Sequence, residues 1–224
     1  MCQVRAGRRT LDGVVVPRLY AIVDDATVGA AGQSALLIEA VARLAGAGVR
    51  WIQLRAKQLA DRDLYLAVEG SLERLHGHPG VSLWIDDRVD CAACLPVAGV
   101  HLGQRDLPAS AARSVLGGDR WIGLSTHTVA QGRAGQSDPA VDLVAIGPVY
   151  GTRSKRAPGR VVGLGGVERA RALGEKPLVA IGGIDVERAR AVIDAGADAV
   201  AVIGALGGLH QLERNARRLL DVLG

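Results

Sequence analysis

The sequence has no phenylalanine, one methionine, and only three tryptophans and three tyrosines among its 224 residues. Because aromatic side chains are scarce and 49% of the chain is apolar, we expect a core of Val, Ile, Leu and Ala. No apolar stretch approaches the roughly 18 residues that a membrane-spanning helix needs, so no membrane helix or membrane partner is expected. The N-terminus lacks the apolar segment of a signal peptide. We therefore expect a cytoplasmic protein, with residues 1–16 as a flexible extension and one domain at 17–224.

Cysteine is also scarce, at three residues: Cys2, Cys91 and Cys94. The CAAC stretch at 91–94 has the spacing of half a metal or redox site. No second pair exists to complete a zinc site, and the stretch falls within an expected helix. We interpret Cys91 and Cys94 as small, semi-buried residues in a reducing compartment.

The formal net charge is +4 and the isoelectric point is about 9.3. A basic chain can bind nucleic acid, but that needs a basic stripe and a recognisable motif. Here the arginines are dispersed, apart from a mild cluster at Arg5, Arg8 and Arg9. We therefore expect no nucleic-acid partner, and a homo-oligomer is compatible with the sequence.

Short apolar runs alternate with longer helical patterns along the chain. The expected strands cover residues 18–23, 50–54, 81–85, 99–102, 121–125, 141–146, 177–183 and 197–204. The expected helices cover residues 35–48, 61–75, 89–95, 108–116, 128–134, 167–173, 186–196 and 210–223. Asp61 is a candidate N-cap of its helix, and residues 155–166 are expected to form a mobile, glycine-rich loop over the site.

Eight strand–helix units are typical of an α/β TIM barrel, (β/α)₈, although a doubly wound open sheet alternates in the same way. The unit length, the glycine pairs after the last two strands and the lack of a G-x-G-x-x-G motif after the first strand favour the barrel. In such barrels the functional groups follow the carboxyl ends of the strands.

Those positions carry cations, hydroxyl groups and glycines. Arg55, Lys57 and Lys155 are suited to phosphate oxygens, and Thr152 and Ser154 add hydroxyl donors. The glycines after the seventh and eighth strands are typical of a phosphate site made of backbone N–H groups. The pattern predicts two phosphorylated substrates, one of them a pyrophosphate.

Two acids at the same edge, Asp87 and Asp106, are suited to Mg²⁺, which commonly takes one or two carboxylates plus substrate phosphates. Each feature also has a plain structural interpretation. Arg55 could be a solvated surface cation, and His101 a packed core histidine. His127 could act as an acid or base, or orient Ser125. No G-x-S-x-G motif surrounds Ser125, so a hydrolase is not indicated.

Six motifs together resemble the thiamine phosphate synthase family, over about residues 18–222. They are QLRAK (53–57), IDDR (85–88), HLGQRD (101–106), STH (125–127), GPVYGTRSK (147–155) and AIGGI (180–184). The resemblance implies a magnesium-dependent transferase of thiamine biosynthesis. It joins hydroxymethylpyrimidine pyrophosphate to thiazole phosphate by a dissociative mechanism, giving thiamine phosphate and pyrophosphate.

The resemblance also implies roles for individual residues. Asp87 and Asp106 would bind Mg²⁺, and Arg55, Lys57, Ser125 and Lys155 would serve catalysis. The substrate-binding residues would be Gln53, Asp86, His101, His127, Thr152, Ser154, Gly182, Gly183, Ile203 and Gly204.

Four positions depart from the family pattern. Ala56 replaces a usual acid, Asp86 replaces a usual Asn that donates to pyrophosphate, and Gln131 stands nearest to a common glutamate. The T-x-T-K loop reads T-R-S-K. An ionised Asp86 cannot donate a hydrogen bond, so its role is open.

Two other functions compete with the synthase. The related thiazole tautomerase would use His127 as acid and base, without the magnesium aspartates. A non-catalytic paralogue that binds phosphorylated ligands is the other, motivated by Ala56 and Asp86. The presence of Asp87, Asp106 and Lys155 favours the synthase.

Overall fold

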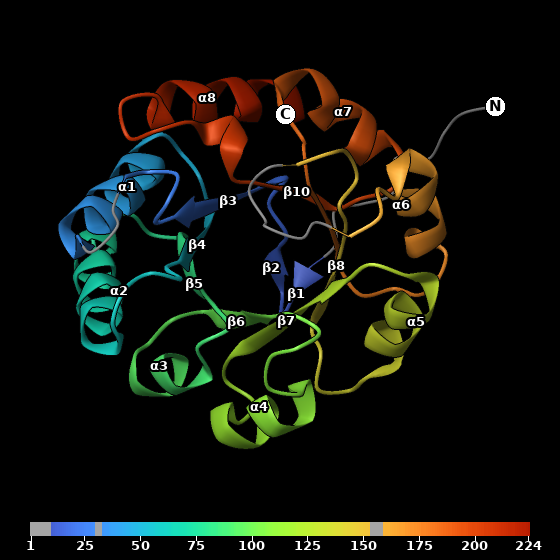
Figure 1. Ribbon diagram of the computed structural model, residues 1–224, viewed down its shortest axis with the longest axis horizontal. Helices are drawn as coiled ribbons and strands as arrows, with labels where there is room; N and C mark the ends of the chain where they lie inside the picture. Colours follow the sequence, from blue (N-terminus) through green and yellow to red (C-terminus); the bar gives the residue numbers. More distant parts are fainter. Residues whose placement is uncertain (1–9, 30–32, 153–158) are drawn as a thin grey trace.

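Eight parallel strands close into a barrel surrounded by eight helices in the computed structural model, which describes residues 10–29, 33–152 and 159–224 (Figure 1). The strands are β3 (Leu19–Asp24), β4 (Trp51–Arg55), β5 (Ser82–Asp86), β6 (Gly99–Leu102), β7 (Trp121–Thr126), β8 (Leu143–Ile146), β9 (Leu178–Ile181) and β10 (Ala199–Val202). The helices are α1 (Ser34–Gly46), α2 (Asp61–Leu75), α3 (Val89–Cys94), α4 (Ala109–Leu116), α5 (Val129–Ser137), α6 (Gly163–Arg171), α7 (Val186–Asp194) and α8 (Leu212–Leu223), with a short 3₁₀ turn at Gly204–Leu206. The predicted TIM barrel is confirmed.

The strands pair in sequence order, and β10 closes the ring by pairing with both β3 and β9. All eight ladders are parallel, so every carboxyl end lies at the same mouth of the barrel. Both faces of each strand are covered, which explains the apolar runs. None of the helices in the described residues is long and apolar enough to cross a membrane.

Two cores differ in composition. Between strands and helices the packing is aliphatic, as expected. The barrel interior also holds aromatic side chains, because Tyr20, Trp51 and Trp84 are buried there among aliphatic residues and Trp121 packs against them. The Trp51 and Trp84 ring centroids are 5.2 Å apart, and Trp84 and Trp121 stack at 5.6 Å. Gly99 makes room for this cluster, since a Cβ there would lie 2.8 Å from the Trp84 ring. The expectation of a wholly aliphatic core is wrong for this interior.

A hairpin closes the amino-terminal end of the barrel. Strands β1 (Thr10–Leu11) and β2 (Val14–Val15) pair antiparallel, and Figure 1 shows them within the ring of strands. Leu11 and Val16 are buried in the aromatic cluster, and the Trp121 indole donates to the Asp12 carboxylate at 2.5 Å. The sequence pattern sets residues 1–16 apart as a flexible extension. In the structure, residues 10–16 instead pack on the barrel, and residues 1–9 lie outside the described residues.

Two local expectations also differ from the structure. Helix α6 begins at Gly163, inside a stretch expected to be a loop. The Val162 and Gly163 N–H groups donate to the carbonyls of Pro148 and Val149, so tertiary contacts offset the poor helix propensity of glycine. Asp61 is not an N-cap: it is the first residue of α2, and its carboxylate pairs with Arg88 at 2.7 Å.

Candidate functional site

A cavity of about 120 Å³ opens at the carboxyl ends of the strands, directly above the aromatic cluster. Its lower wall is apolar, and its upper wall carries side chains that the sequence motifs single out. The predicted residues that line it are Gln53, Arg55, Asp86, His101, Ser125, His127, Thr152, Gly182 and Ile203. The barrel thus brings together residues that lie up to 150 positions apart in the sequence.

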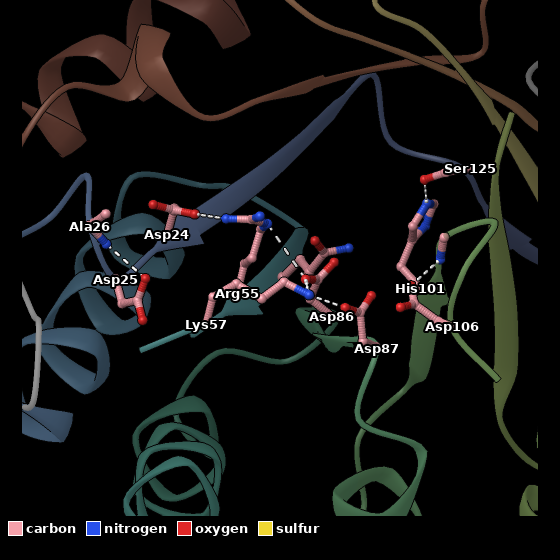
Figure 2. A network of polar contacts seen from close by, with 12 residues as sticks. Asp24, Asp25, Ala26, Arg55, Lys57, Asp86, Asp87, His101, Asp106 and Ser125 are labelled. Atoms are coloured by element: carbon pink, nitrogen blue, oxygen red, sulfur yellow. Dashed lines mark hydrogen bonds and ion pairs between the residues drawn. The ribbon is translucent and has the colours of Figure 1, made fainter. Parts of the chain in front are cut away.

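A row of alternating charges runs along the mouth, from Asp24 through Arg55, Asp86 and Lys57 to Asp87 (Figure 2). Arg55 binds the Asp24 carboxylate and lies 3.5 Å from that of Asp86. The Lys57 ammonium lies 2.9 Å from Asp86 and also binds Asp87. Lys57 therefore offsets the repulsion between the two adjacent acids that end β5.

Asp87 has a left-handed backbone, with φ at +58°. Its N–H donates to the His101 carbonyl at 2.9 Å, which ties the end of β5 to β6. Asp and Asn tolerate this conformation better than most residues, because their short polar side chains bond locally. Apart from glycine, the backbone therefore favours one of these two residue types at position 87.

The two predicted magnesium ligands follow neighbouring paired strands, Asp87 after β5 and Asp106 after β6. The Asp106 carboxylate accepts from the Gly103 N–H at 2.7 Å, which fixes its loop. No group of three or more His, Cys, Asp or Glu side chains that could hold a metal occurs within residues 10–29, 33–152 and 159–224. Two carboxylates fit Mg²⁺ only as a site shared with substrate phosphates.

His101 and Ser125 form a bonded pair in the cavity wall. The His101 Nε2 lies 2.9 Å from the Ser125 hydroxyl, and the Gln104 amide donates to the Ser125 carbonyl at 2.7 Å. The imidazole packs on Gly123, where a Cβ would lie 2.4 Å from Nδ1. His101 is therefore both a packed core histidine and a cavity-lining group.

Gln53 donates from its amide to the Tyr20 hydroxyl at 2.9 Å inside the barrel. Burial raises the pKa of Tyr20 well above its usual value, and the negative charge of Asp86 raises it further, against the opposing effect of Gln53. The phenol is therefore neutral, and its proton is a hydrogen-bond donor at the cavity. The sequence motifs do not single out Tyr20, because a lone tyrosine in an apolar strand resembles ordinary core.

His127 is oriented by its backbone surroundings. Its Nδ1 lies 2.6 Å from the Gly147 carbonyl, and its N–H donates to the Gln131 side chain at 2.8 Å. A carbonyl oxygen only accepts, so Nδ1 carries a proton. Gln131, which stands nearest to a glutamate common in the family, thus fixes the backbone just before α5 by accepting from the His127 N–H.

Glycines after β9 allow close backbone packing at the mouth. Gly182 has φ at +107° and Gly183 at +61°, and a Cβ at Gly182 would lie 2.5 Å from Pro148. Arg188 donates to the Gly183 carbonyl at 2.8 Å and stacks over the Tyr150 ring at 4.8 Å. The 3₁₀ turn that begins at Gly204 follows β10, directly after Ile203. The predicted glycine loops therefore meet at one side of the cavity.

Ser154 and Lys155 lie outside the described residues, between Thr152 in the cavity wall and Gly159. Two further acids at the mouth, Asp24 and Asp25, are 4% and 1% exposed and do not belong to any of the six motifs. The sequence does carry a signal for them, which is a repeated pattern. VDD at 23–25 ends the first barrel strand as IDD at 85–87 ends the third.

The CAAC stretch lies on α3, away from the cavity. Cys91 is buried, and burial raises the pKa of its thiol to about 11, so it stays protonated near neutral pH. Cys94 is exposed. The expectation of semi-burial is therefore wrong for Cys94, and the geometry gives the stretch no part in the site.

Known proteins are similar to this chain in sequence and in fold. A family model described as thiamine monophosphate synthase matches residues 19–206. A thiamine-phosphate synthase of Koribacter versatilis is 44% identical over 94% of this chain and 98% of its own length. One of Moorella thermoacetica is 39% identical over 80% of this chain and 84% of its own.

Among solved structures, a thiamine phosphate pyrophosphorylase of Pyrococcus furiosus superposes with a TM-score of 0.81 at 27% identity. The match covers 92% of this chain and 95% of that one. A geranylgeranylglyceryl phosphate synthase of Thermoplasma acidophilum is only 14% identical, with a TM-score of 0.63, and shares the fold alone.

Proposed function

Because this chain belongs to the thiamine-phosphate synthase family of transferases, we propose that it joins hydroxymethylpyrimidine pyrophosphate to thiazole phosphate. The products are thiamine phosphate and pyrophosphate. The observation that carries the proposal is the row of charges beside a ring-sized cavity at one barrel mouth. The cavity suits an apolar ring with polar edges, and the neighbouring cations suit the pyrophosphate attached to it.

Departure of the pyrophosphate is the step that most needs stabilisation. The bond between the pyrimidine methylene carbon and the pyrophosphate oxygen breaks, and the electron pair leaves with the oxygen. The thiazole nitrogen then donates its lone pair to the methylene carbon. Charge collects on the leaving group, so cations placed there lower the barrier. We assign Arg55, Lys57 and Lys155 to this role, with Thr152 and Ser154 as hydroxyl donors.

Asp87 and Asp106 would hold Mg²⁺ together with the pyrophosphate oxygens. The metal, when bound, supplies charge neutralisation and a template for the leaving group. Lys57 binds Asp87 through its ammonium, so in this proposal the lysine turns from the carboxylate to the phosphate. No protein nucleophile is required.

The pyrimidine would lie in the cavity against Gln53, His101 and Ser125, with His127 at its edge. The apolar floor beneath them supports this placement, because it excludes water from the carbocation. The thiazole phosphate would accept backbone hydrogen bonds around Gly182, Gly183, Ile203 and Gly204.

A second candidate, thiazole isomerisation, is motivated by His127, whose Nδ1 is fixed by the Gly147 carbonyl. The synthase is favoured because the paired strands β5 and β6 carry two carboxylates that isomerisation does not need. Relatives 44% and 39% identical to this chain are also thiamine-phosphate synthases. A non-catalytic paralogue would bind both phosphates and perform neither reaction.

The test is pyrophosphate release from the two substrates, with Mg²⁺ and with the metal chelated. Metal-dependent release together with thiamine phosphate formation supports the synthase. Metal-independent release, or isomerised thiazole without release, refutes it. Binding of both substrates without either reaction identifies the paralogue.

A cytoplasmic location, small-molecule substrates and a homo-oligomeric state belong to the same proposal. The free thiols of Cys91 and Cys94 support the location, because thiols persist in reducing compartments. Cell fractionation and light scattering test the location and the oligomeric state.

A further inference from the structure

Two buried carboxylates at the end of β3 lie beside the site without lining the cavity. Asp24 is 4% exposed and Asp25 is 1% exposed, and neither borders the cavity. Burying a carboxylate is costly unless hydrogen bonds or a cation compensate it. Their partners therefore indicate what the two acids stabilise.

Asp24 uses its two oxygens in two directions. One oxygen accepts from the Thr27 N–H at 3.2 Å and from the Thr27 hydroxyl at 3.3 Å. The other binds the Arg55 guanidinium (Figure 2). Asp24 is thus anchored by Thr27 in its own loop and, through its other oxygen, fixes the position of the Arg55 guanidinium.

Asp24 and Asp86 compete for the same guanidinium on unequal terms. The Asp24 side chain is 5% exposed and Thr27 anchors it, whereas the Asp86 side chain is 13% exposed and lies 3.5 Å from Arg55. An incoming anion therefore displaces Asp86 more easily than Asp24.

Asp25 acts on the next cation through the backbone. Its carboxylate accepts from the Ala26 N–H and from the Gln58 N–H, both at 2.8 Å. Its own N–H donates to the Arg55 carbonyl at 3.0 Å. Lys57 lies between these two anchored backbone groups, and its side chain is 43% exposed. The backbone anchors therefore set where its ammonium can reach.

We propose that Asp24 and Asp25 are positioning residues for the two phosphate-binding cations, Asp24 for Arg55 and Asp25 for Lys57. The inference rests on the proposed function only in taking the anion to be a pyrophosphate. The consecutive acids keep both cations at the mouth when the anion replaces Asp86 and Asp87 as their partner. Neither acid touches the substrate.

The test is a double-mutant cycle on the affinity for inorganic pyrophosphate with Mg²⁺, measured by calorimetry on the full chain. Removing a partner that orients a metal-binding side chain typically costs about 10–100-fold in metal affinity; we expect the low end for an oriented phosphate-binding cation, so Asp24→Asn should weaken binding about tenfold. In an Arg55→Ala background the same change should add less than about twofold, because its target is gone. Asp25→Asn should behave in the same way with Lys57→Ala.

A merely structural role predicts a different outcome. If Asp24→Asn lowers the affinity for thiazole phosphate as much as that for pyrophosphate, or keeps its full effect without Arg55, the inference is wrong. The matched control is Asp142→Asn at the opposite end of the barrel. Asp142 also pairs with an arginine and accepts from a backbone N–H. Its substitution should lower the melting temperature without changing the KM for the pyrimidine pyrophosphate.

Thr27→Val covers the case in which the Asp24 variant does not fold. It removes one hydroxyl bond to the Asp24 carboxylate and should weaken pyrophosphate binding about twofold to threefold, the low end of the net contribution of one hydrogen bond. No change would overturn the inference. If pyrophosphate binding depends on Asp24 as described but the wild-type protein forms no thiamine phosphate, the proposed function is wrong and the positioning role is unaffected. A wild-type chain that does not bind pyrophosphate overturns the positioning role itself.

Discussion

Replacing Asp86 by Asn should tighten pyrophosphate binding at a small cost in stability. Asp86 lies 2.9 Å from the Lys57 ammonium and 3.5 Å from the Arg55 guanidinium, the two cations that the substrate needs. In the free protein, Asp86 therefore competes with the substrate for both. Asn keeps the size of the side chain, removes the charge and adds a hydrogen-bond donor.

The magnitude follows from the exposure of the pairs. The Lys57 side chain is 43% exposed, so solvent screens its pair with Asp86, and such pairs contribute about 0.2–1 kcal/mol. A loss of about 1 kcal/mol lowers the melting temperature of a domain this size by roughly 2–4 °C. In the wild type, pyrophosphate must break the Asp86 ion pairs before it can bind the two cations. Because the Asn variant has no such pairs to break, about 1 kcal/mol is added to the binding free energy, which tightens binding about fivefold.

Calorimetric titration with magnesium pyrophosphate at low and high salt is the assay. The gain should shrink as salt rises, because the Debye length falls from about 10 Å at 0.1 M to about 3 Å at 1 M. Asp61→Asn is the matched control, since it breaks an exposed pair with Arg88 outside the cavity. If the Asp86→Asn variant is inactive, or binds pyrophosphate no more tightly than the wild type, the reasoning is refuted and Asp86 has a positive role.

Three further outcomes are expected. Asp87→Asn keeps a residue type that tolerates the left-handed backbone at +58°. It should abolish magnesium-dependent turnover, while the Kd for thiazole phosphate, measured by calorimetry, changes less than about twofold. If turnover and thiazole phosphate affinity fall equally, the two sites are not separate. Gly182→Ala places a Cβ 2.5 Å from Pro148 at φ +107°, so it should lower the free energy of unfolding by about 2–4 kcal/mol. Gly118→Ala, with open space around it, is its control in denaturant titrations. Cys94 should react with a thiol reagent at pH 8, whereas Cys91, whose pKa burial raises to about 11, should react only on unfolding. Mass mapping of labelled peptides distinguishes the two thiols. Rapid labelling of Cys91 would contradict this prediction and show that α3 opens.

The barrel could be predicted from the sequence because eight buried strands alternate with eight helical patterns. That alternation also locates the mouth, so residues such as Arg55, His101 and Ser125 could be placed at one cavity because they lie at the carboxyl ends of the strands. The six motifs sharpened the placement, because they fall where strands end.

The parts that escaped prediction depend on contacts between distant segments. Asp24 ends an apolar strand and has no special spacing to Arg55, 31 residues away, so only the β3–β4 pairing reveals their bond. The α6 start depends on the Pro148 and Val149 carbonyls, which local propensity does not include. The aromatic interior was missed for a similar reason: composition counts tryptophans without showing that all three gather in one barrel.

The gathering of Trp51, Trp84 and Trp121 has a spectroscopic consequence. All the indole emission of this protein comes from one cluster beneath the cavity. Tyr20 links the two, with its ring 5.7 Å from Trp84 and 6.5 Å from the His101 ring in the cavity wall. The tryptophan emission of the unlabelled protein should therefore change when a ring enters the site, and it should not change with movements confined to the outer helices.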